Sequence, residues 1–279
     1  MHLIRNIALI SLLFTITAIN KVSGQRIINV GIHVAPCLSS IKTDFPASIK
    51  DLKSEGGLSF NFRISGKYFL TEQVGVSSGF EIMGFKQASS ATSTYESFNV
   101  FYTETQFYER RVWGDSIKEN VTLNILHIPL QMFYQHKFNN AVSIFGSLGP
   151  GISIPVASKN SGSGTFTYKG YFPEERALLW DIPVYGLSSD VDVKIDNKPE
   201  LNPMIINFVA TLGVETSINR YYRFTAAVGY YHSLTNVFKH GNSIHVSNQI
   251  GSYNSILGTG KNHLSNMWFS IGLSKNILF

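Results

Sequence analysis

Charged side chains, cysteines and long apolar runs are all scarce in this chain of 279 residues. Only 15 % of the residues are charged, against roughly 25 % in an ordinary soluble domain. Cys37 is the only cysteine, which excludes an intramolecular disulfide and leaves either a reactive thiol or a small buried residue. A transmembrane helix needs about 20 consecutive apolar residues, and every apolar run after residue 25 is much shorter than that. A disulfide-stapled domain and a helical membrane protein are therefore both excluded.

Strong net charge is also lacking. Loss of Arg5 and Lys21 with a leader would leave 21 basic residues (23 − 2) and 18 acidic ones, a charge of 21 − 18 = +3. That charge is too small and too dispersed to predict a nucleic-acid partner. The chain also has no glycine-rich phosphate loop and no Cys/His zinc spacing, so we expect no cofactor.

The N-terminus has the layout of a secretory signal peptide. Arg5 precedes an apolar run from Ile7 to Ile19, and the small residues at 22–24 precede Gln25. A membrane anchor is the alternative, but the run is too short for one and ends at Asn20-Lys21. The residue directly after the predicted cleavage site is Gln25 and not a cysteine that could carry a lipid. We predict a cleaved signal peptide over residues 1–24 and one mature domain over residues 25–279.

The last sixteen residues alternate in polarity over most of their length. One face holds Met267, Phe269, Ile271, Leu273, Ile277 and Phe279, and between residues 268 and 276 the other face is small or polar apart from Trp268. Successive side chains of a strand point to opposite faces, so this segment is a strand with one apolar face. Such a strand needs partners on both edges, and the first strand of a closed barrel would supply one. A terminal aromatic after alternating apolar residues also resembles the insertion signal of outer-membrane barrels.

Seven further segments alternate in the same way. They are residues 26–35, 58–70, 74–85, 118–136, 141–156, 204–218 and 222–238. The connections alternate between long and short, the rhythm of an up-and-down barrel with short periplasmic turns and long outer loops. We therefore predict an all-β fold, an eight-stranded antiparallel transmembrane barrel with long extracellular loops, in the outer membrane and in contact with its lipid. Residues 88–117 are predicted to extend two strands beyond the bilayer as a hairpin.

A secreted β-sandwich is the alternative fold, because short strands separated by turns also suit it. The polar face carries Arg63, Glu81, Glu215 and Arg223, which would be costly in a sandwich core unless paired. In a barrel these four residues are candidates for an ion-pair network in the lumen. Pairing Leu70 with Val74 across the short turn places Arg63 directly opposite Glu81.

Two prolines conflict with the predicted strands, because proline cannot donate to a ladder. Pro129 lies in the fourth segment and Pro150 in the fifth. The sequence Gly149-Pro150-Gly151 predicts a β-bulge there.

Three short motifs resemble a known family. They are H-I-P-L-Q-M-F-Y at 127–134, G-S-L-G-P-G-I at 146–152 and Y-Y-H-S-L-T-N-V at 230–237. Together they resemble the PorT-like outer-membrane barrel family, which includes a component of a protein-secretion and gliding apparatus. The resemblance implies a barrel and possible partners in a secretion or envelope complex, but no activity. Where that family often has an acidic residue before I-P-L, this chain has His127.

Enzymatic chemistry has weak support. A lipid acyl hydrolase would need Ser and His together, but His232 and Ser233 are adjacent on a strand and face opposite sides. Asp190, Asp192 and Asp196 lack the glycine and the glutamate of an EF-hand, which favours a solvated edge strand over a calcium site. We predict that the protein is not an enzyme.

The remaining candidates are surface features. The insertion at 158–202 includes Leu178, Leu179, Trp180 and Tyr185, which could form an exposed partner site or pack over the outer mouth of the barrel. An eight-stranded barrel is only wide enough for its side chains to fill, which counts against a diffusion pore. We expect a scaffold or interaction protein, with a lipid hydrolase or a narrow channel as the alternatives.

Overall fold

The computed structural model describes residues 27–44, 49–101, 106–239, 246, 247, 250 and 253–278. The predicted signal peptide at 1–24 lies outside these residues, and so does the terminal Phe279. No helix in the described part is long and apolar enough to cross a membrane.

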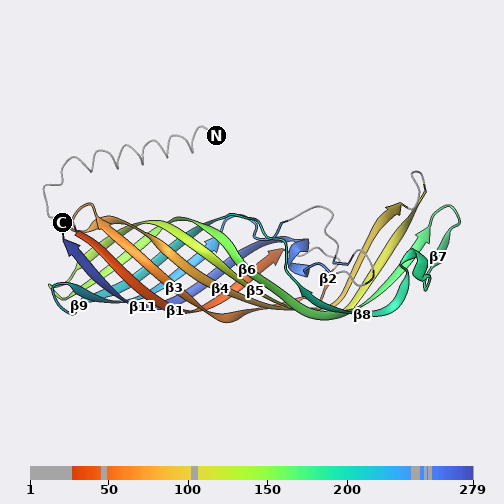
Figure 1. The fold of residues 1–279 in the computed structure, drawn as a ribbon, viewed down its shortest axis with the longest axis horizontal. Helices are drawn as coiled ribbons and strands as arrows, with labels where there is room; N and C mark the ends of the chain where they lie inside the picture. Colours follow the sequence, from red (N-terminus) through yellow and green to blue (C-terminus); the bar gives the residue numbers. More distant parts are fainter. Residues whose placement is uncertain are drawn as a thin grey trace, which may run out of the picture.

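Eight antiparallel strands form a closed ring (Figure 1). They are β1 (Ile27–Asp44), β3 (Lys53–Phe69), β4 (Val74–Phe101), β5 (Phe107–Lys137), β6 (Val142–Phe172), β9 (Ile205–Ser217), β10 (Tyr222–Ser233) and β11 (Lys261–Leu278). Each strand pairs with the next along the chain, and β11 pairs with β1 to close the ring. The predicted eight-stranded up-and-down barrel is confirmed, including the pairing of its last strand with its first.

The short turns at one end of the ring use one chemistry. Asn139 Oδ1 accepts hydrogen bonds from the N–H groups of Ala141 and Val142, and Asn219 Oδ1 accepts from those of Tyr221 and Tyr222. The Thr71 hydroxyl does the same in the β3–β4 turn. Asn and Thr side chains stabilise tight turns in this way because they replace a backbone acceptor. These turns mark the predicted periplasmic end.

Side chains alternate between the two faces of the wall as predicted. The outward positions in the membrane-spanning part of the ring are exposed and apolar: Leu130, Met132, Leu212, Val228, Phe269 and Ile271. The inward positions of the same strands are buried and mostly polar: Gln131, Gln135, Thr211, Glu215, Thr225 and Ser270. An apolar exterior around a polar interior is the pattern of a transmembrane barrel, and the reverse of a soluble one.

This polarity inverts further along the same strands. On β5 the outward residues change from Leu126 and Leu130 to Lys118, Asn120 and Thr122. The inward residues become apolar at the same level: Ile117, Val121, Leu123 and Ile125 are each at most 1 % exposed. The wall therefore leaves the bilayer near Leu126 and continues as a water-soluble sheet with an ordinary apolar core.

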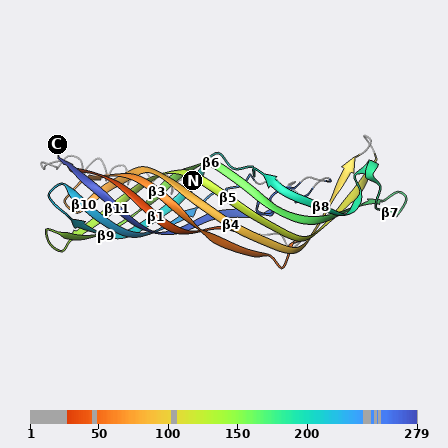
Figure 2. The same cartoon turned by 60° about the horizontal axis from the view of Figure 1, so that its bottom comes forward.

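Beyond the ring, β4, β5 and β6 project as a curved sheet (Figures 1 and 2). The short strands β2 (Ile49–Lys50), β7 (Ala177–Leu179) and β8 (Ser188–Asn197) extend this sheet at its edges. The prediction that 88–117 continues two strands as a hairpin is confirmed. The fifth strand was predicted to end at Val156, which is wrong, because β6 runs to Phe172 by pairing with the lengthened β5.

The predicted bulge at Gly149-Pro150-Gly151 is also wrong. Pro150 pairs with Phe208 in an unbroken register with β9. The opposite edge keeps one register from Pro129↔Gly151 to Met132↔Leu148. The irregularities of the β5–β6 ladder lie instead at Asn124/Ile125 and Asp115/Lys118.

Candidate functional site: a sealed polar lumen and an outer sheet

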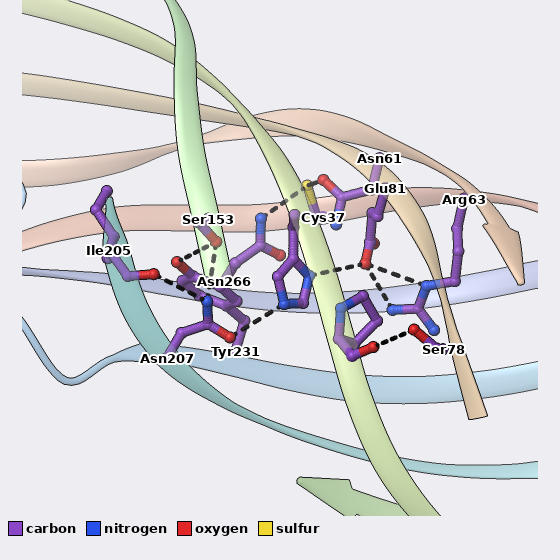
Figure 3. Close-up of polar contacts among 12 residues, drawn as sticks. Cys37, Asn61, Arg63, Ser78, Glu81, Ser153, Ile205, Asn207, Tyr231 and Asn266 are labelled. Carbon is purple, nitrogen blue, oxygen red and sulfur yellow. Dashed lines mark hydrogen bonds and ion pairs between the residues drawn. The ribbon is translucent and has the colours of Figure 1, made fainter. Parts of the chain in front are cut away.

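The upper lumen network crosses the barrel from β3 to β10 (Figure 3). Arg63 donates from Nε (3.1 Å) and Nη2 (2.8 Å) to Glu81 Oε2. His127 Nδ1 lies 3.5 Å from the same oxygen, and His127 Nε2 lies 3.0 Å from Asn207 Oδ1. Asn207 in turn donates to Ser153 Oγ, which lies 3.1 Å from the Tyr231 hydroxyl. Six side chains from six strands are thereby linked in one chain of contacts.

The upper network has little spare space. A Cβ atom added at Gly151 would lie 2.4 Å from His127 Nε2, so only glycine lets the histidine occupy this position. Cys37 belongs to a separate group of polar contacts in the lumen: its thiol donates to Asn61 Oδ1 at 3.2 Å and accepts from Asn266 Nδ2 at 3.4 Å. Cys37 is buried, so of the two predicted roles the structure favours the small buried residue.

The lower lumen network lies nearer the short turns. Lys67 donates to Glu215 Oε1, and Gln135 Nε2 and Arg223 Nη1 approach the other carboxylate oxygen at 3.1 Å and 3.5 Å. The Lys67 ammonium also lies 3.7 Å from the centre of the Phe145 ring, a cation–π contact. Glu215 is thus shared by two cations and an amide.

The four predicted lumen residues therefore fall into two groups. Arg63 lies directly opposite Glu81 in the β3–β4 ladder, in the register that the 70–74 turn predicted. Glu215 and Arg223 come within 3.5 Å on neighbouring strands. Sequence reasoning missed Lys67 as the closest partner of Glu215. No local signal could reveal that contact, because the two residues are 148 positions apart and meet across the lumen.

Between the two networks lies a cavity of about 30 Å³. Its lining combines Arg63, Lys67 and His33 with hydroxyl side chains such as Thr211 and Thr225. A water molecule needs about 10–15 Å³ of such volume, so the cavity holds only two or three waters. The lumen is filled by its own side chains, as the width of eight strands predicted.

A cluster of apolar side chains closes the outer mouth of the ring. The 3₁₀ helix η2 (Ile256–Thr259) contributes Leu257, and the segment after β10 contributes Val237 and Phe238. They pack on Ile41, Phe85 and Leu264 of the wall, and all are at most 1 % exposed. Residues 234–238 were predicted to continue the seventh strand, which is wrong, because β10 ends at Ser233 and this segment turns inward to cover the mouth.

Two carboxylates of the outer sheet, Glu96 and Glu119, bind the segment that connects β10 to β11. Both lie beyond the apolar band of the barrel. Glu119 accepts from the Tyr253 hydroxyl (3.0 Å), the Ile256 N–H (2.9 Å) and the Ser255 hydroxyl. Glu96 accepts from the Val246 N–H at 2.9 Å. Burial raises the pKa of both carboxyl groups, and the hydrogen bonds they accept offset part of that rise.

The predicted loop residues lie far from this mouth, at the tip of the outer sheet (Figure 1). Trp180 and Tyr185 are 54 % and 42 % exposed, and Leu178 is 36 % exposed. Leu179 packs instead against the cluster of Tyr108, Phe172 and Leu187. The alternative that this segment closes the barrel is wrong, since η2 and residues 237–238 do so.

Trp180 joins a larger surface that sequence reasoning missed, which we call the outer aromatic face. It comprises the side chains of Tyr95, Arg111, Trp113, Lys169, Tyr171 and Trp180 on one side of the outer sheet. The Lys169 ammonium lies 5.3 Å from the Trp113 ring and 5.6 Å from the Trp180 ring. The Arg111 guanidinium lies 4.6 Å from the Tyr171 ring, and Tyr95 packs on Trp113 at 5.1 Å. The alternation of 107–115 was the available signal for this face.

The structure also places the residues considered for catalysis and for metal binding. Ser233 is fully buried and its hydroxyl accepts from the Leu264 N–H at 2.7 Å, while His232 is on the other face of β10. Asp190, Asp192 and Asp196 lie on β8, an edge strand as predicted. Within the described ranges, no three His, Cys, Asp or Glu side chains are grouped so that they could hold a metal.

The closed ring, the apolar exterior and the sealed polar lumen define a transmembrane β-barrel of the outer-membrane class. The sequence profile described as "Outer membrane protein beta-barrel domain" matches residues 23–239, and the chain belongs to this family. Membership implies location in the outer membrane. No curated protein matches the sequence.

Several solved outer-membrane proteins resemble the chain weakly. Neisserial surface protein A is 12 % identical, with 89 % of this chain and 96 % of that one covered and a TM-score of 0.38. OprG from Pseudomonas aeruginosa is 16 % identical, with 91 % and 96 % covered and a TM-score of 0.38. Ail of Yersinia pestis is 10 % identical, with 90 % and 99 % covered and a TM-score of 0.33. At these scores the likenesses carry no functional argument.

Proposed function

We propose that this barrel is a non-conducting, non-enzymatic scaffold of the outer membrane that binds a partner protein through its outer aromatic face. The partner belongs to a protein-secretion or envelope-assembly complex, in keeping with the PorT-like motifs at 127–134, 146–152 and 230–237. The observation that carries the proposal is the outer aromatic face itself, held on a rigid sheet beyond the bilayer.

The composition of that face suits protein recognition. Trp, Tyr and Arg are the residues most enriched where binding energy concentrates in protein interfaces. Here Trp113, Trp180, Tyr171 and Arg111 lie together and are already ordered by cation–π contacts. Because their side chains are held before a partner arrives, binding costs less conformational entropy.

The sealed lumen supports a scaffold over a narrow channel. Among the described residues, the cavity between the two networks holds only two or three waters, and Lys67 and Arg63 line it while held in ion pairs. A lipid hydrolase has no support from the one Ser–His arrangement that the sequence offered, because Ser233 is buried and hydrogen-bonded away from His232.

The proposal is tested by isolating the tagged barrel from detergent-solubilised outer membranes of the native cell. We expect a stoichiometric partner that is lost from the Trp113→Ala/Trp180→Ala double variant. Asn120→Ala/Thr122→Ala is the matched control, because these residues are on the outward side of β5 nearer the membrane. Equal recovery of the partner by both variants would refute the role of the outer aromatic face.

Two further measurements separate the alternatives. Stable unitary conductance of the pure protein in a planar bilayer would contradict the sealed lumen and favour the channel. Release of fatty acid from lipid A by an isolated monomer would favour the hydrolase. The scaffold proposal expects neither.

A further inference from the structure

A small patch of one lysine and two histidines lies on the outward side of the barrel wall, just beyond the apolar band. It is formed by Lys42 of β1, His263 of β11 and His232 of β10, three adjacent strands. Lys42 and His263 are directly opposed in the β1–β11 ladder. The rings of His263 and His232 are stacked with their centres 5.6 Å apart.

The register of β1 against β11 fixes the height of the patch. Successive outward pairs are Leu38↔Met267, Ser40↔Ser265 and Lys42↔His263. Leu38 and Met267 are 65 % and 60 % exposed and belong to the apolar band. Within two pairs the outward side chains thus change from lipid-exposed aliphatic groups to a lysine and a histidine. Lys42 and His263 therefore lie where the hydrocarbon ends and lipid headgroups begin.

The imidazole of His263 is held in a defined orientation. Its Nδ1 lies 3.0 Å from the backbone oxygen of Ser233 and so donates to it, which leaves Nε2 free for an external partner. Tyr230 stacks on His232 from the membrane side, with ring centres 6.3 Å apart and planes within 7°. The Tyr230 hydroxyl accepts a hydrogen bond from Ser265 Oγ at 3.1 Å. The Tyr230 ring thus packs on His232 from the membrane side, and His232 in turn stacks on His263.

The charges around the patch leave it positive. Asp44 is the outward residue one pair further out, and the ladder sets it opposite Lys261. Lys42 and Lys261 outnumber this carboxylate, and within the described part of the chain Lys42 forms no ion pair. A lysine and two imidazoles at headgroup level favour an oxyanion with several acceptor oxygens.

We propose that Lys42, His232 and His263 bind the phosphate of an outer-leaflet lipid. The phosphate would accept hydrogen bonds from the Lys42 ammonium and, when both ring nitrogens of His263 carry a proton, from its Nε2–H. Its acyl chains would lie along the exposed side chains of Leu38, Met267 and Val228. The source is a lipid rather than free phosphate because the patch continues directly into the apolar band. This inference is independent of any protein partner.

The test measures lipid binding to the folded barrel in phosphatidylcholine nanodiscs. The probes are lipid A with its phosphate groups and the same lipid after enzymatic removal of the phosphates. Wild type is expected to bind the phosphorylated form more tightly. The Lys42→Gln/His263→Gln variant is expected to lose about tenfold in affinity for that form and none for the dephosphorylated one. Lys118→Gln, on the outward side of β5, is the matched control and should bind as wild type does.

Each remaining outcome would overturn the assignment. Equal binding of both lipid forms by wild type would show that the phosphate is not recognised. Equal losses in the double variant and the Lys118→Gln control would show only a general effect of surface charge. Displacement of the lipid by inorganic phosphate at similar concentrations would identify a site for free phosphate. Retention of the heat-resistant compact form on gels verifies that each variant is folded.

Discussion

Replacing Glu81 by alanine is expected to destabilise the barrel far more than replacing a surface carboxylate. Glu81 is only 1 % exposed and, among the described residues, is the one acid that forms an ion pair with Arg63. Its removal leaves the Arg63 guanidinium, 13 % exposed, facing the Trp268 ring at 5.3 Å with no counter-charge. His127 also loses the carboxylate near its Nδ1.

The size of the effect follows from burial. Removing one partner of a buried ion pair costs about 3–5 kcal/mol, because the remaining charge stays desolvated. Arg63 borders the small lumen cavity, where two or three waters can partly solvate it. We therefore expect about 3 kcal/mol, the lower end of that range. Replacing both residues by leucine should cost less, since no unpaired charge then remains.

The outer sheet supplies the matched control. Glu109 accepts from Arg111 at 2.9 Å, a distance like that between Arg63 and Glu81, but these side chains are 28 % and 29 % exposed. An exposed pair contributes about 0.2–1 kcal/mol, so Glu109→Ala should lower the free energy of unfolding by less than about 1 kcal/mol.

Urea unfolding of the barrel in detergent micelles, followed by tryptophan fluorescence, measures all three variants. Equal losses for Glu81→Ala and Glu109→Ala would refute the reasoning, because they would mean that lumen and surface charges are equally solvated. A double leucine variant that is less stable than Glu81→Ala would refute it as well.

Three further predictions concern the wall and the outer connection. Leu212→Arg puts a cation on the lipid face midway along β9, where Leu212 is 62 % exposed, and should cost about 2–4 kcal/mol in lipid vesicles; a negligible loss would mean that Leu212 does not face the hydrocarbon. Gly229→Ala should cost about 1–3 kcal/mol in the urea assay, because the added Cβ would lie 2.3 Å from the Trp268 ring; Gly66→Ala, with no atom within 4 Å of the added Cβ, is the control. Burial raises the pKa of Glu119 in the folded protein above the value of an ordinary glutamate. Its carboxyl group therefore stabilises the packing of residues 253–256 on the outer sheet at a pH below that ordinary value, and the contribution is lost as the pH rises through the raised pKa. Hydrogen exchange at Ile256 should therefore increase from pH 5 to pH 8 beyond the intrinsic rate, and Glu119→Gln should remove that increase; the same pH dependence in the variant would contradict it.

Alternation along single segments was enough to predict the strands and the orientation of their side chains. Each strand carries its own information, because a side chain at i and one at i+2 share a face whatever the rest of the chain does. The tight 70–74 turn also linked two strands rigidly, so the opposition of Arg63 and Glu81 could be predicted. Both inferences need only local geometry.

Strand lengths could not be predicted in the same way. Where β5 and β6 leave the bilayer, the inward side chains become apolar and the outward ones polar, so the expected pattern disappears although the ladder continues. The polarity of a strand reports its surroundings, and these change from lipid to water along one continuous strand.

Contacts between distant segments were decided by the tertiary structure alone. Lys67 meets Glu215 only because closure of the ring brings β3 and β9 to face each other across the lumen. Leu257 and Phe238 close the mouth because the side chains of Glu119 and Asn262 bind η2 and the backbone of Phe238. The sequence by itself determined which side chains face inward, since that depends on parity within a strand. Which of them touch depends on how the ring closes and what covers it, and that is set by the whole chain.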